Sequence, residues 1–201
     1  MSQINNIDQS IRVAAAVTML SVDVYYTIKR GISNLRYFTS QSNYLSALLM
    51  MSSSFSGLKL IKLEALAHCN MMITAVIYIV VLLPDYIKNG IQKTKAEWMI
   101  SACQHGGFQV IFSYYFIRKL KDVGSDAEIN ISVTKLVVFY LLIYSLSSYF
   151  LLFIFDVPVP YMFLDTKLAW GLLIWLPAVF LFIILVAKTH DFVVHSFLHK
   201  M

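Results

Sequence analysis

The chain is poor in charged residues and in the residues that interrupt helices. Only 13% of its 201 residues are charged, and it contains 7 glycines and 4 prolines. A soluble domain has about 25% charged residues, and a β-barrel needs many turn residues, so both classes are excluded. Hydrophobic residues make up 59% of the chain, the mean hydropathy is +0.70, and the apolar residues form long blocks. This composition predicts an all-α, polytopic membrane protein.

Cysteine is also scarce, with only Cys69 and Cys103. Both lie inside apolar blocks without CxxC or zinc-finger spacing, so we expect packing roles and no disulfide framework or metal site. The net charge of +5 comes from basic residues dispersed between the apolar blocks, which argues against a nucleic-acid partner. Because the sequence has no phosphate-cradling glycine loop and no dinucleotide fingerprint, no cofactor is expected.

Six apolar blocks are long enough to cross a hydrocarbon layer of about 30 Å, which takes roughly 20 residues. We therefore predict a single six-helix transmembrane domain over residues 1–201, with helices at 9–28, 38–59, 62–83, 96–117, 133–156 and 168–189. The short connections make consecutive helices antiparallel neighbours and place both termini on one side. More Lys and Arg residues fall on that side than on the other, which favours cytoplasmic termini. Residues 190–201 are expected to form an amphipathic tail.

Four polar segments fall at the end of the predicted bundle that is away from the termini. They are Asp23 in the first helix, residues 37–43 at the start of the second, residues 104–107 in the fourth, and the connection 156–165. Polar groups at membrane depth are costly and often mark functional sites. Their convergence predicts a pocket that opens toward this side.

Within this cluster, a hydroxyl and an imidazole stand on different helices. Thr39 shares a helix face with Asn43, four residues later, and His105 can accept a proton near neutral pH. Gly106 and Gly107 would let another helix or a ligand approach closely. A hydroxyl and an imidazole are the minimum equipment of nucleophilic acyl chemistry. A membrane histidine can equally serve as an interhelical hydrogen-bonding group, and the residues by themselves leave both interpretations open.

Other polar residues in the apolar blocks are better explained by packing. His68 and Asn70 lie toward the terminal side, where interhelical hydrogen bonding is the simpler interpretation. The spacing of Ser52 and Ser56 is typical of close helix packing. For Asp23, an interhelical hydrogen bond is favoured over orientation of His105.

Three short motifs carry a resemblance to a known family. They are Tyr37-Phe38-Thr39-Ser40-Gln41-Ser42-Asn43, Gln104-His105-Gly106 and Pro160-Tyr161-Met162-Phe163-Leu164-Asp165. In order and spacing, over nearly the whole chain, they resemble the androgen-induced-gene and androgen-dependent TFPI-regulating protein family, especially its microbial relatives. The resemblance implies a six-helix membrane enzyme that cleaves fatty acid esters of hydroxy fatty acids. The segment 40–43 is more polar than expected of the animal proteins, which leaves the substrate open.

Carried over by motif, the resemblance implies that Thr39 is the nucleophile and His105 its general base, with a lipid or amphiphilic acyl ester as substrate. We take the oxyanion donors from Asn43, Gln104, Arg36 and Tyr161, and we count Asp23 among the residues near the substrate. Arg36 could instead bind a free carboxylate, or it could be a charge that snorkels to the interface.

A different class of protein also suits six helices in about 200 residues. In a small substrate-binding membrane subunit of a vitamin or small-solute transporter, the polar cluster would bind a solute without turnover. A scaffold without chemistry would have to explain His105 and the polar start of the second helix by packing alone. The effect of removing the Thr39 hydroxyl discriminates between the enzyme and the transporter subunit.

Overall fold

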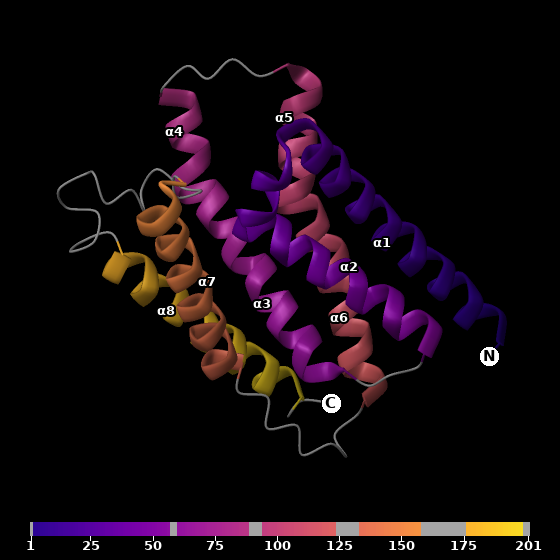
Figure 1. Cartoon of the computed structure of the whole chain (residues 1–201). Coiled ribbons are helices and arrows are strands. Elements are labelled where there is room, and N and C mark those ends of the chain that lie inside the picture. The colour runs from indigo at the N-terminus through magenta and orange to yellow at the C-terminus, as the bar shows by residue number, and fades with distance from the viewer. Residues whose placement is uncertain (1, 57–59, 89–93, 124–132, 158–175, 199–201) are drawn as a thin grey trace. The chain divides into compact units, whose positions relative to one another are not determined.

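The described part of the chain is all-helical, as the composition predicts. The computed structural model describes residues 2–56, 60–88, 94–123, 133–157 and 176–198 (Figure 1). In chain order the elements are α1 (Ser2–Arg30), η1 (Ile32–Arg36), α2 (Phe38–Ser56), α3 (Ile61–Ile77), η2 (Tyr78–Leu82), α4 (Leu83–Lys88), α5 (Lys95–Ala102), η3 (Cys103–Gly107), α6 (Phe108–Val123), α7 (Val133–Phe155) and α8 (Leu176–Leu198). η1 is a 3-10 helix, and η2 and η3 are π-helical turns inside longer helices.

The chain falls into two compact units, Met1–Ala127 and Glu128–Met201. The first contains α1 to α6, and the second contains α7 and α8. In the first unit, α1 packs along α2, α2 packs against α3, and α3 packs against α6 (Figure 1). The candidate site predicted from the sequence lies in this unit, apart from the connection 156–165.

Among the described residues, four helical stretches are long and apolar enough to cross a membrane. They are Gln9–Lys29, Ile61–Lys88, Val133–Phe155 and Pro177–Ser196. Each stretch also exposes large apolar side chains, such as Ile28, Ile79, Phe153 and Leu185. Exposed apolar surface on this scale is compatible with a membrane protein.

Helix boundaries differ from the prediction mainly at the last helix. α8 is Leu176–Leu198, against an expected 168–189, so residues 190–198 of the expected tail are part of this helix. Pro177 lies in its first turn, where the missing N–H costs no hydrogen bond. Because no glycine or proline follows Pro177 in the helix, nothing interrupts it near residue 189.

The π-helical turn η2 precedes a proline inside a long helix. Pro84 has no N–H to donate to the carbonyl of Val80, and its ring would clash with that carbonyl in regular α geometry. The widened turn Tyr78–Leu82 accommodates Pro84 without ending the helix. The block 62–83 of the sequence therefore becomes one continuous helical column that runs from Ile61 to Lys88.

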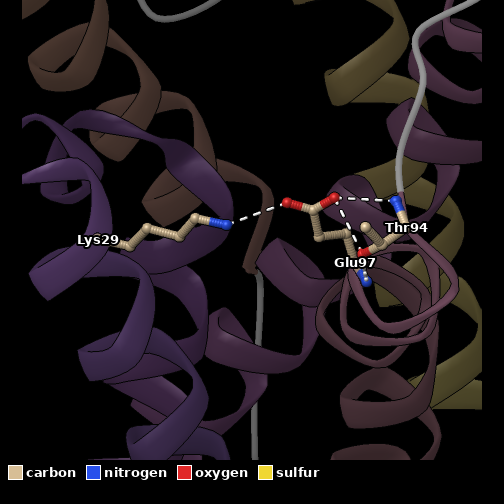
Figure 2. Close-up of polar contacts among 3 residues, drawn as sticks. All are labelled: Lys29, Thr94 and Glu97. Carbon is tan, nitrogen blue, oxygen red and sulfur yellow. Dashed lines mark hydrogen bonds and ion pairs between the residues drawn. The ribbon is translucent and has the colours of Figure 1, made fainter.

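Polar contacts join the last turn of α1 to the first turn of α5 (Figure 2). Lys29 Nζ donates to Glu97 Oε1 at 3.0 Å, and Glu97 Oε2 accepts from the Thr94 backbone N–H at 2.9 Å. Thr94 Oγ1 in turn accepts from the Glu97 N–H at 3.2 Å, which completes a capping box. This pairing explains why α5 begins at Lys95.

Gly31 makes the turn between α1 and η1. Its φ of 73° and ψ of −173° belong to a backbone region that only glycine adopts without strain. We expect Gly31→Ala to lower the free energy of unfolding by about 1–3 kcal/mol, measured by denaturation of the purified protein. Gly106→Ala is the matched control, because a Cβ there would meet no atom within 4 Å. Equal stability of the two variants would contradict this prediction.

In the second unit, Asp191 of α8 caps the start of α7. Its carboxylate accepts from the backbone N–H groups of Val133, at 2.9 Å, and Thr134, at 3.2 Å, and from Thr134 Oγ1 at 2.7 Å. A helix N-terminus carries unpaired N–H groups and a partial positive charge, so a carboxylate is favoured there. The N-terminal cap of α7 is thus a side chain from another helix, α8.

Replacing Asp191 with alanine is expected to destabilise the protein by about 2 kcal/mol, because two backbone donors and a hydroxyl lose a charged acceptor. The measurement is the shift in thermal unfolding of the purified protein. Thr189→Ala serves as the control, since the Thr189 hydroxyl bonds to the Leu185 carbonyl of its own helix, at 2.9 Å. The cap assignment is wrong if both variants unfold at the same temperature.

Candidate functional site

Thr39 and His105 meet between two helices. Thr39 Oγ1, in the first turn of α2, lies 3.4 Å from Nδ1 of His105 in η3. The Thr39 side chain is 7% exposed, so little water competes for this contact. The structure thus brings together the hydroxyl and the imidazole that the sequence could place only at the same end of the bundle.

The start of α2 holds Thr39 in place through a buried polar turn. Phe38, Ser40 and Ser42 are all buried beside it. Ser42 Oγ donates to the Phe38 carbonyl at 2.8 Å, and Gln41 Nε2 donates to the Leu35 carbonyl of η1 at 2.9 Å. These bonds engage the Ser42 hydroxyl and the Gln41 amide nitrogen.

A stacked tyrosine holds the imidazole of His105 from a neighbouring helix. The ring of Tyr78, in η2, lies parallel to the imidazole, with centroids 4.3 Å apart and planes 4° apart. Ser101 Oγ donates to the Tyr78 hydroxyl at 3.4 Å. Both rings stand on π-helical turns, which are rare and frequently occur at functional sites.

Asp23 is tied to the residue that precedes His105. Gln104 Nε2 donates to Asp23 Oδ1 at 2.9 Å, which links α1 to η3. Asp23 is fully buried, and the side chains of Asn43 and Ser40 lie near the same carboxylate. Asp23 therefore lies beside the site and helps to position η3, the segment that carries His105.

Several polar atoms around Asp23 have no hydrogen-bond partner within the described part of the chain. They are Asp23 Oδ2, both amide atoms of Asn43, and Ser46 Oγ. Asn43 and Ser46 lie on one face of α2, and all three residues are at most 1% exposed. A buried polar group without a partner costs about 1–3 kcal/mol. These atoms are available to a polar ligand group or to water.

Of the other predicted site residues, Arg36 and Asn43 are described by the structure and Tyr161 is not. Arg36 is the last residue of η1 and is half-buried close to the start of α2. Asn43 follows Thr39 by one turn of α2. Tyr161 and most of the connection 156–165 lie outside the described residues.

One expectation about the fourth helix is wrong. Cys103, expected to pack in the core, is exposed on η3, whereas Cys69 is buried. The close helix approach allowed for at Gly106 and Gly107 is not seen, because added Cβ atoms would meet no other helix within 4 Å among the described residues.

Sequence reasoning missed Tyr78 and also a buried ion pair at the other end of α2. Lys119 Nζ donates to Glu64 Oε1 and, at 2.6 Å, to Ser53 Oγ. Tyr115 donates its hydroxyl to the same Glu64 oxygen at 2.6 Å. A glutamate inside an otherwise apolar block was the signal for this pair, whereas nothing in the sequence marked Tyr78.

Comparison of the chain with protein-family models, curated proteins and solved structures found no match. The chemistry of the site must therefore be argued from the arrangement of its own residues. In the part of the chain that is described, no three His, Cys, Asp or Glu side chains group as metal ligands would. The arrangement is a hydroxyl hydrogen-bonded to an imidazole, beside buried amide and carboxylate groups.

Proposed function

We propose that this protein is an intramembrane lipid ester hydrolase in which Thr39 is the nucleophile and His105 the general base. The observation that carries the proposal is the 3.4 Å contact between Thr39 Oγ1 and His105 Nδ1. The resemblance to the androgen-induced-gene and androgen-dependent TFPI-regulating protein family supports the same two roles. It also suggests fatty acid esters of hydroxy fatty acids, or related acyl esters, as substrates.

In the proposed reaction, His105 carries its proton on Nε2, so that Nδ1 can accept the Thr39 proton. The Thr39 oxygen attacks the ester carbonyl, and the imidazolium then gives the proton to the leaving alcohol. Water, deprotonated by the same imidazole, hydrolyses the acyl-threonine. The separation of 3.4 Å is long for such a bond, but catalytic hydrogen bonds commonly tighten only when substrate binds.

Asn43 is the best placed oxyanion donor among the residues that the sequence suggested. Its amide is buried one turn from Thr39 and has no hydrogen-bond partner among the described residues. Gln104, in contrast, already donates to Asp23. Preorganised donors of this kind stabilise a developing oxyanion by several kcal/mol. Arg36 would bind a free carboxylate of the substrate.

The same proposal includes the placement in the membrane. Six helical columns would each cross the bilayer, with both termini cytoplasmic. The columns are α1, α2, α3 to α4, α5 to α6, α7 and α8. An amphiphilic ester would enter laterally, with its acyl chain among apolar helices. The membrane would supply the substrate at high local concentration.

Binding of a small solute is the second candidate, and the buried polar atoms of Asp23, Asn43 and Ser46 favour it. Such atoms could recognise a polar solute without any chemistry. In that case, the protein would act as a binding subunit of a transporter. Removal of the Thr39 hydroxyl would then change affinity modestly and abolish no reaction.

The experiment exposes purified protein to a fluorophosphonate probe and then to a fatty acid ester of a hydroxy fatty acid. Wild type is compared with Thr39→Ala and with Thr39→Ser, which keeps a hydroxyl. Thr18→Ala is the matched control, because the Thr18 hydroxyl is exposed and bonds to the Ala14 carbonyl of its own helix. We expect adduct and fatty acid release from wild type, Thr39→Ser and Thr18→Ala. Full turnover by Thr39→Ala would refute the proposal.

A further inference from the structure

A second hydroxyl–imidazole pair shares the column of α5, η3 and α6 with the first. Ser113 Oγ, in α6, is 2.8 Å from Nε2 of His68 in α3. This distance is in the middle of the range for a strong hydrogen bond, and it is shorter than the 3.4 Å of the Thr39–His105 pair. Ser113 follows His105 by eight residues, or about 12 Å along the helix. The two pairs therefore lie at different depths of the first unit.

Aromatic rings hold the imidazole of His68 in place. Its ring stacks on Phe116, with centroids 4.8 Å apart and planes 26° apart, and lies 6.3 Å from the ring of Phe112. Phe112 and Phe116 are at most 1% exposed, so their rings are held firmly by packing. Ser113 is only partly covered, at the margin of the buried face of α6. A reacting group therefore approaches the pair from the side of the Ser113 hydroxyl.

The hydrogen-bond directions prepare Ser113 as a nucleophile. Gln109 Nε2 donates to Ser113 Oγ at 3.0 Å, so the serine oxygen accepts this bond and its single proton remains for His68 Nε2. His68 then accepts at Nε2 and carries its own proton on Nδ1. A nucleophile and a base within hydrogen-bond reach are the pair that acyl-transfer chemistry requires, and the Gln109 amide orients the nucleophile of this pair.

A buried acceptor adjoins the pair. Oε1 of Gln109 has no hydrogen-bond partner within the described residues, although it is buried. Since the amide nitrogen of Gln109 is engaged by Ser113, this oxygen is left to accept from a ligand. The hydroxyl of a hydroxy fatty acid, which is the leaving group of the proposed ester class, could supply such a donor.

We propose that Ser113 and His68 form a second acyl-transfer site, which acts on amphiphilic acyl esters. His68 Nε2 takes the Ser113 proton as the serine oxygen bonds to the acyl carbon, and the ester C–O bond then breaks. The leaving alkoxide takes the proton from the imidazolium and departs as an alcohol. Water, deprotonated by His68, later releases the fatty acid and restores the serine.

The test is site-mapped labelling with a fluorophosphonate probe on the full chain in detergent micelles, read by mass spectrometry of the digested protein. We expect an adduct on Ser113 in the wild type and in Thr39→Ala. The adduct should be lost in Ser113→Ala and should form at least tenfold more slowly in His68→Phe. Phenylalanine preserves a ring over Phe116 and removes only the base, and the unfolding temperature of each variant is measured alongside.

Each outcome bears on the second site by itself. A folded wild type that carries no adduct on Ser113, or a His68→Phe variant labelled there at the wild-type rate, would overturn the proposal. Stability losses in Ser113→Ala and His68→Phe without any Ser113 adduct would assign the pair to helix packing. Because Thr39 and Ser113 fall in different peptides, failure of one site is read separately from failure of the other.

Discussion

In a Ser113→Ala background, which removes the proposed second site, the His105→Ala substitution is expected to slow ester hydrolysis about 10²–10⁴-fold, the usual contribution of a general base. The expected loss is in kcat, because the imidazole acts on the proton of Thr39 and does not hold the acyl chain. The measurement is the release of fatty acid by the purified variant under saturating substrate. Fluorophosphonate labelling of Thr39 should fall in parallel, since attack by the Thr39 oxygen needs the same base.

Substitutions at Tyr78 provide the matched comparison. Tyr78→Phe keeps the ring that stacks on His105 and removes only the hydroxyl that accepts from Ser101. It should therefore retain most of the turnover. Tyr78→Leu removes the ring, frees the imidazole to rotate, and should lower kcat more than it raises KM. A His105→Ala variant that turns over like its Ser113→Ala parent would eliminate the general-base role, whatever Tyr78 does.

The helical class of the chain could be predicted because it depends on properties that are summed over long segments. Apolar blocks of about 20 residues form helices in almost any packing arrangement. The first five blocks accordingly correspond to helical columns, even where π-turns interrupt them. The last helix continues beyond its expected end at residue 189, to Leu198, and its expected start at 168 lies outside the described residues.

The rotation of each helix could not be predicted, and His105 shows why. A π-turn adds one residue to a turn, which displaces every later side chain by about 100° relative to a regular helix. η3 falls on Cys103–Gly107, within the motif that carries the site. Apolar composition placed Cys103 in the core although it is exposed, and it could not show which helix the imidazole faces. The stack on Tyr78 depends on a second π-turn at η2, so no spacing rule in either helix reveals it.

The role of a charged residue was equally hard to predict without knowing which residue it pairs with. Lys119 was counted among the basic residues that set orientation, yet its ammonium group reaches the buried carboxylate of Glu64. The two residues are 55 positions apart, on α6 and α3. Only the fold brings them together, although a fully buried glutamate always requires such a partner.

The largest expected change in stability follows from breaking this ion pair on one side. Lys119→Met should lower the free energy of unfolding by about 3–5 kcal/mol, because it leaves the Glu64 carboxylate buried without a countercharge. Tyr115 would still donate to Glu64 Oε1, but Glu64 Oε2 has no hydrogen-bond partner within the described part of the chain. Thermal unfolding of purified protein in detergent measures the loss.

The double variant Glu64→Gln with Lys119→Met separates the value of the pair from the penalty of an unpaired charge. It removes both charges and keeps an acceptor for the Tyr115 hydroxyl, so its stability should return to within about 1 kcal/mol of wild type, since replacing a buried pair is often nearly neutral. Arg12, whose guanidinium lies 5.3 Å from the Tyr115 ring centroid, is present in every variant and cancels in the comparison. If the double variant is as unstable as Lys119→Met, the lysine acts through its contact with Ser53, 2.6 Å away, and not through the carboxylate. If the double variant instead recovers wild-type stability, the fold does not need the Glu64–Lys119 charges near the end of α2. The pair would then be retained for something other than stability.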